Sequence, residues 1–176
     1  MRGFVICVLL SMYITGCKSG INKNNSEMVN RTLSFDSTIL LIEKKVVDLT
    51  SAEDLFAVQE FVGIYENPHL FSGDAISFIY RADRTDQQKL IAVYSMQKLS
   101  LNEYLKIFEK AIAQFNNSKL SEVVLENIIS APIGKEKIIL NNSRNQSVLK
   151  LLNELKNNSR VSEKLRYRIE KIITRE

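Results

Sequence analysis

The residues with the greatest chemical potential lie in one polar segment, residues 65–88, which read YENPHLFSGDAISFIYRADRTDQQ. This segment holds the only histidine of the chain, His69, together with Asp74, Arg81 and Arg84. An imidazole close to a carboxylate is able to transfer protons or to bind a metal ion. If these side chains converge, they form an acid–base or metal site on the connection between two helices.

The same segment also has a structural explanation. Pro68 cannot continue a helix, while Ser72 is a suitable N-cap that would leave Asp74 in the first turn of the next helix. Thr85 and Asp86 start a further helix in the same way. A carboxylate near a helix N-terminus is stabilised by the helix dipole, so these acidic residues need no catalytic role.

We favour the structural explanation and expect Arg81 and Arg84 to form ion pairs with Asp83 or Glu66. The side chains of the segment that remain candidates for contact with a partner protein are His69, Asp74, Arg81 and Arg84. This places any function of the segment in binding rather than in catalysis.

A second charged region is the helix predicted at the C-terminal end of the chain. Its basic residues are Arg160, Lys164, Arg166, Arg168, Lys171 and Arg175. Such a face is able to contact anionic lipid headgroups or an acidic partner, with Arg166 and Arg168 at its centre. The structural alternative, which we favour, is a solvated face whose charges pair with acidic neighbours four residues away.

The beginning of the chain shows the pattern of a secretory signal. Arg2 supplies a positive charge, and twelve residues from Gly3 to Ile14 form an apolar run broken only by Ser11. A helix needs about 20 such residues to cross a bilayer. The hydrophobic part of a secretory signal is typically about 7–15 residues long. The run therefore predicts a signal peptide.

The run ends in Ile14-Thr15-Gly16-Cys17, which resembles the lipobox of bacterial lipoproteins. The resemblance implies that Cys17 carries a diacylglycerol on its sulfur and that residues 1–16 are removed. Lys18 follows the cysteine where an aspartate would retain such a protein at the inner membrane. The resemblance thus favours the outer membrane, on its periplasmic side. Acylation would anchor the protein firmly, since each buried methylene contributes roughly 0.8 kcal/mol.

The expected mature protein consists of a lipidated tether, residues 17–30, and a single domain, residues 31–176. Cys7 lies within the signal, so the domain has neither a free thiol nor a disulfide. Removal of Arg2 with the signal leaves 23 basic and 20 acidic residues, a net charge of +3. This charge is too small to indicate binding to nucleic acid.

Motifs for catalysis are missing from the sequence. No serine lies in a Gly-x-Ser-x-Gly elbow, and the six glycines form no phosphate-binding loop. A single histidine without cysteine or histidine partners does not build a structural zinc site. We therefore expect a protein that is not an enzyme and that uses no cofactor or metal.

Helix signals recur along the domain. Four pairs of residues match the capping box, in which a Ser or Thr side chain and a Glu or Gln three residues later satisfy backbone donors. These pairs are Thr50 and Glu53, Thr85 and Gln88, Ser100 and Glu103, and Ser143 and Gln146. Apolar residues at helical spacing predict helices over 55–65, 101–115, 120–128, 148–155 and 161–172. Residues 90–99, LIAVYSMQKL, are apolar nearly all round and predict a central buried helix.

Two segments allow alternatives. Residues 37–49 are rich in β-branched residues and fit a strand, but their apolar spacing favours a helix. Residues 135–140 fit a short strand or an extra helical turn. Helices joined by short turns make antiparallel neighbours. The sequence predicts an all-α fold, either an antiparallel helical bundle or a short HEAT-like stack of helical hairpins.

These observations together predict an outer-membrane-anchored lipoprotein that acts by binding protein. We expect its partner to be a secreted antibacterial toxin, which it would neutralise as an immunity or inhibitor protein. The alternative partner is a component of a secretion system or pilus, in a pilotin-like assembly role. An enzyme of the envelope is the least favoured possibility.

Overall fold

The computed structural model describes residues 33–46, 52–130 and 146–174. Over these ranges the chain forms α-helices and one short 3₁₀ helix, without any strand, which confirms the predicted all-α fold. The predicted signal, Cys17, the tether and residues 135–140 lie outside the described residues. The predicted caps Thr50 and Ser143 lie outside them as well.

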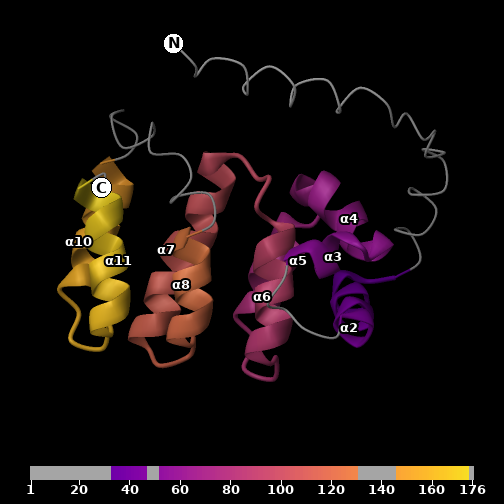
Figure 1. The fold of residues 1–176 in the computed structure, drawn as a ribbon, viewed down its shortest axis with the longest axis horizontal. Helices are drawn as coiled ribbons and strands as arrows, with labels where there is room; N and C mark the ends of the chain where they lie inside the picture. The colour runs from indigo at the N-terminus through magenta and orange to yellow at the C-terminus, as the bar shows by residue number, and fades with distance from the viewer. Residues whose placement is uncertain (1–32, 47–51, 131–145, 175–176) are drawn as a thin grey trace, which may run out of the picture.

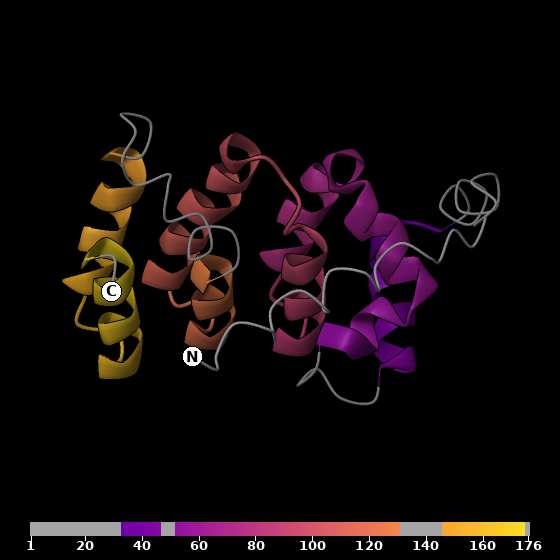
Figure 2. The ribbon, with the colours of Figure 1, turned by 45° about the horizontal axis from the view of Figure 1, so that its top comes forward.

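The helices lie side by side in chain order along the long axis of the molecule (Figures 1 and 2). They are α2 (Phe35–Lys45), α3 (Ala52–Phe56), α4 (Gln59–Glu66), η1 (Pro68–Leu70), α5 (Ser72–Ile79), α6 (Asp86–Ser95), α7 (Leu101–Asn116), α8 (Glu122–Ser130), α10 (Gln146–Lys156) and α11 (Glu163–Thr174). No helix in the described ranges combines the length and the apolar character needed to cross a bilayer.

Successive helical hairpins form the layers of the molecule. Helix α7 packs on α8, and α10 packs on α11. Neighbouring layers are joined by contacts of α6 with α8 and of α7 with α10. Figure 1 shows the α7–α8 hairpin between the α10–α11 hairpin and α6. This arrangement is a stack of hairpins, the second of the two predicted forms.

Helix α6 is the central element, as the sequence predicts. It contacts α2, α4, α5 and α8, and Ile91, Val93 and Met96 are buried. Its first turn is a capping box, in which the Thr85 hydroxyl accepts from the Gln88 N–H at 3.2 Å and the Gln88 side chain accepts from the Thr85 N–H at 3.2 Å. The α-helix ends at Ser95, and the remaining buried residues of the segment continue in turns.

The ambiguous segment 37–49 is helical as far as it is described. Phe35, Ile39 and Ile42 face the core at the spacing of one helix face. The helix ends at Lys45, where Val46 becomes extended. Helix packing against α4, α5 and α6 therefore outweighs the β propensity of the branched residues.

The helix predicted over residues 55–65 is interrupted, which corrects the sequence analysis. Helix α3 ends at Phe56 and α4 begins at Gln59, with Val58 extended at φ −94° and ψ 113°. The break allows both Leu55 and Val58 to reach the core, where they are 1% and 7% exposed. Burial of both side chains accounts for a break that the apolar spacing does not reveal.

The predicted N-cap at Ser72 is also wrong. Phe71 precedes the helix and Ser72 is its first residue, with the Ser72 hydroxyl donating to the His69 carbonyl at 3.4 Å. The 3₁₀ helix η1 leads almost directly into α5, and the Phe71 carbonyl accepts the first helical bond, from Ala75, at 2.8 Å. Asp74 does lie in the first turn of α5, as expected.

Candidate functional site

The predicted acid–base residues do not come together. His69 is exposed in η1, and Asp74 is exposed in α5. Within the described ranges no hydrogen bond or ion pair joins the two side chains, and no group of three or more His, Cys, Asp or Glu residues is arranged to hold a metal ion. These two residues provide exposed polar surface on the η1–α5 segment.

Arg81 and Arg84 converge on an acidic residue that the sequence analysis missed. Both guanidinium groups pair with Asp36 in the first turn of α2, with a distance of 2.5 Å from Arg84. Asp83 also pairs with Arg81, at 2.8 Å, and with Arg84, at 3.7 Å, as expected. The hydrogen bond from Arg81 is the main reason that the pKa of Asp83 is lowered. The two arginines therefore fasten the α5–α6 connection to α2.

The other expected acidic partner, Glu66, pairs instead with Lys98 at 2.6 Å. The Arg84 side chain is only 14% exposed, and its guanidinium lies 4.9 Å from the centre of the Phe78 ring. Arg84 is thus a structural residue of the fold, whereas Arg81 keeps 44% of its side chain exposed.

Arg166 and Arg168 are likewise engaged within the fold. Arg166 donates to the carbonyl groups of Lys156, Asn158 and Val161, at 3.0, 3.5 and 3.2 Å. These bonds close the α10–α11 turn. Arg168 pairs with Glu126 on α8, a residue that the sequence analysis did not single out. These two residues of the predicted basic face therefore bind α11 to the neighbouring elements of the fold.

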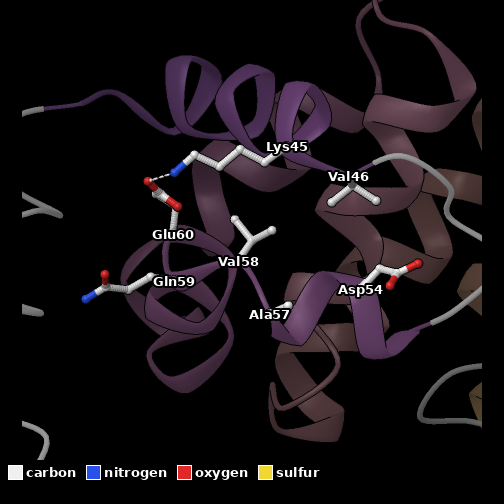
Figure 3. Close-up of a pocket in the computed structure, with 7 residues that line it drawn as sticks. All are labelled: Lys45, Val46, Asp54, Ala57, Val58, Gln59 and Glu60. Carbon is white, nitrogen blue, oxygen red and sulfur yellow. Dashed lines mark hydrogen bonds and ion pairs between the residues drawn. The ribbon is translucent and has the colours of Figure 1, made fainter.

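A pocket of about 440 Å³ lies near the other end of the stack, where α2 ends and the break between α3 and α4 occurs (Figure 3). The residues that line it are Lys45, Val46, Asp54, Ala57, Val58, Gln59 and Glu60. Val46 and Val58 are nearly buried, while Ala57 is exposed. The pocket thus combines an apolar surface with charged groups of both signs.

An ion pair dominates the electrostatics of this pocket. Lys45 Nζ donates to Glu60 Oε1 at 2.5 Å, and the Glu60 side chain is 12% exposed. This hydrogen bond lowers the pKa of Glu60, although burial of the carboxyl opposes the effect. The second oxygen, Glu60 Oε2, is buried without a hydrogen-bond partner among the described residues.

The opposite side of the pocket carries Asp54, an exposed residue of α3. Its carboxylate forms no hydrogen bond or ion pair in the part of the chain that the structure describes. A ligand with positive charge would therefore meet two acidic groups and a single lysine. We take this pocket as the candidate functional site.

Sequence reasoning missed the pocket for a specific reason. Lys45 and Glu60 are 15 residues apart and lie on different helices. The helix break at Val58 gives no signal in the apolar spacing. The only available sign is the density of charge around residues 43–45 and 53–54, which by itself is typical of a solvated surface.

Comparison of the chain with protein-family models, with curated proteins and with solved structures finds no match.

Proposed function

We propose that this protein is a lipid-anchored envelope protein that acts by binding another protein. The observation that carries the proposal is the charged pocket formed by α2, α3 and α4 (Figure 3). It is large enough to receive a side chain of a partner, while the acid–base residues of the polar segment stay apart. This combination supports recognition rather than chemistry on a substrate.

The location in this proposal comes from the lipobox-like residues Ile14-Thr15-Gly16-Cys17. Lipidation at Cys17 would hold the domain at the outer membrane, on the periplasmic side. The expected test is the Cys17→Ser variant, which should accumulate as an unprocessed precursor and take up no labelled palmitate. Normal processing and membrane fractionation of this variant would contradict the lipid anchor.

The proposed role is that of an inhibitor that neutralises an antibacterial toxin delivered to the periplasm. A protein that blocks a toxin needs a complementary surface and no cofactor, and an anchor would keep it where the toxin arrives. A resident inhibitor also has to be present before the attack, which agrees with a domain that is stabilised by its own core.

Deletion of the gene tests this role directly. Cells without the protein should lose viability next to neighbours that secrete the toxin, and the full chain should restore survival. Cys17→Ser tests the contribution of the lipid, because it keeps the domain but prevents acylation and processing, and it should restore survival less well than the natural chain. Unchanged survival together with a mislocalised secretin or pilus component would reject the inhibitor role in favour of the assembly role.

A further inference from the structure

The lining of the pocket carries a net negative charge. Asp54 and Glu60 contribute two carboxylates, and Lys45 contributes one ammonium group. This local excess contrasts with the chain as a whole, whose formal net charge is +4. The lining of the pocket thus has a net charge opposite in sign to that of the whole chain, which favours a cationic ligand.

The charged groups stand on either side of an apolar surface. Figure 3 shows the Lys45–Glu60 pair on one side of Val58 and Asp54 on the other, with Val46 and Ala57 near Asp54. A side chain that fits this pattern has an aliphatic stem and a positively charged head. Lysine and arginine both have this form, because their methylene groups pack on apolar surface while the head remains polar.

Glu60 has capacity for a further donor. Lys45 bonds to Oε1 only, and Oε2 is buried without a partner among the described residues. The Glu60 side chain is 12% exposed, and a carboxylate accepts several hydrogen bonds, so Glu60 is able to accept a second donor beside Lys45. A planar guanidinium presents several donors in a fork and is more weakly hydrated than an ammonium group. These properties favour arginine.

We propose that this pocket binds an arginine side chain on the surface of the partner protein. The proposal rests on the proposed protein-binding function and specifies its chemistry. The stem of the arginine packs on Val46 and Val58, and its guanidinium donates to Glu60 and lies close enough to Asp54 to be attracted by its charge. Arginine on a partner is thus the group that the α2–α3–α4 end of the stack recognises.

The direct test is a titration of the full-length chain, held in detergent micelles and labelled with ¹³C in its valine and alanine methyl groups. The probe is Nα-acetyl-arginine amide, and the control ligand is the neutral isostere Nα-acetyl-citrulline amide. We expect the methyl signals of Val46, Ala57 and Val58 to shift along a saturable curve with arginine and to stay in place with citrulline. Equal shifts with both ligands, or no shift with arginine, would overturn the proposal.

Variants then assign the interaction to the pocket. Glu60→Gln should weaken arginine binding roughly tenfold, and Asp54→Asn should weaken it less because Asp54 is exposed. Ala57→Leu should abolish binding by filling the pocket while leaving its charges in place. Glu66→Gln, on the same helix but outside the pocket, should leave binding unchanged. If Glu60→Gln does not fold, Asp54→Asn and Ala57→Leu decide, and unaltered binding in both would refute the site.

The same variants separate this proposal from the inhibitor function. If deletion of the gene sensitises cells but Ala57→Leu restores survival fully, the pocket proposal is wrong and the inhibitor function stands. If deletion has no effect on survival while arginine binds as described, the inhibitor function is wrong and the chemistry of the pocket stands.

Discussion

At the scale of single residues, Asp36 forms ion pairs with two arginines. It lies in the first turn of α2 and accepts from both Arg81 and Arg84, which come from the α5–α6 connection. The Nε atom of Arg84 is buried without a partner among the described residues. The carboxylate of Asp36 is the nearer of the two anionic partners of Arg84, at 2.5 Å against 3.7 Å for Asp83.

Substitution of Asp36 by asparagine should destabilise the protein. The variant keeps the shape of the side chain but leaves the nearly buried Arg84 with only the exposed Asp83, 3.7 Å away, as an anionic partner, so we expect the free energy of unfolding to fall by about 1–2 kcal/mol. Urea denaturation followed by circular dichroism measures the change. Asp83→Asn is the matched control, and it should have a smaller effect because Asp83 is 59% exposed. An equal or larger effect of Asp83→Asn would contradict this assignment.

The Lys45–Glu60 pair makes part of the stability depend on pH. The pKa of Glu60 is lower in the folded protein, chiefly because Lys45 donates to its carboxylate. The unfolded chain therefore takes up the proton first, and the stabilisation is fully present above the ordinary glutamate pKa of about 4.3. It is lost as the pH falls through the lowered pKa of the folded state.

Lys45→Gln should consequently be less stable than the natural chain at neutral pH, and the difference should shrink in acid. Midpoints of urea unfolding between neutral pH and about pH 3 measure this difference, since that interval includes the ordinary pKa of glutamate. Lys98→Gln is the control, because its partner Glu66 is 53% exposed and the loss at neutral pH should be smaller. A difference for Lys45→Gln that persists unchanged in acid would mean that the Glu60 ion pair is not its cause.

At the scale of elements, a single guanidinium closes the last hairpin of the stack. Arg166 lies on α11, and its guanidinium donates hydrogen bonds to three carbonyl groups at the end of α10 and in the following turn. The Lys156 carbonyl, at the end of α10, has no partner within the helix, so Arg166 supplies a donor that the helix lacks there.

Arg166→Lys should therefore loosen the α10–α11 hairpin although it keeps the charge. Lysine cannot span the three carbonyl groups, and we expect a loss of about 1–2 kcal/mol in the free energy of unfolding. Amide hydrogen exchange in residues 146–174 should become faster. Arg168→Lys is the matched control: it can keep its ion pair with Glu126 and should change exchange little. Similar effects of the two substitutions would argue against a special role for Arg166.

At the scale of the whole molecule, one hydrophobic cluster runs through the described helices, from Phe35 in α2 to Ile169 in α11. Phe108, in α7, the longest of the described helices, is fully buried within it. Because the layers share this cluster, the stack should unfold as a unit rather than layer by layer.

Phe108→Ala should lower the free energy of unfolding by about 3–5 kcal/mol, because it leaves a cavity in the core. Circular dichroism and tyrosine fluorescence should report the same transition in the natural chain and a coincident, shifted one in the variant. Val123→Ala is the control, since Val123 is 54% exposed. Two separate transitions in the natural chain would show that the layers unfold independently.

Much of the helical architecture could be predicted from local patterns. The Thr85–Gln88 capping box and the apolar segment 90–99 correctly indicated the start and the burial of the central helix. The break at Val58 could not be predicted, because Leu55, Val58 and Phe61 have the same spacing that a continuous helix would show. The site was missed for the same reason, since the pocket exists only where that break meets the end of α2.

The sequence by itself determined the helical class, the buried faces of most helices and the expectation of a lipid anchor at Cys17. These features depend on neighbouring residues, whose spacing repeats with the turn of a helix or follows a short motif. Only the tertiary structure decided which charges meet. Asp36 with Arg84 and Lys45 with Glu60 are separated by 48 and 15 residues, and their contact depends on how whole helices pack. The packing of the hydrophobic cluster sets the positions of the helices and so brings these charges together. Because apolar burial is non-directional, the local sequence pattern of one helix does not indicate which distant residue its charged side chain will meet.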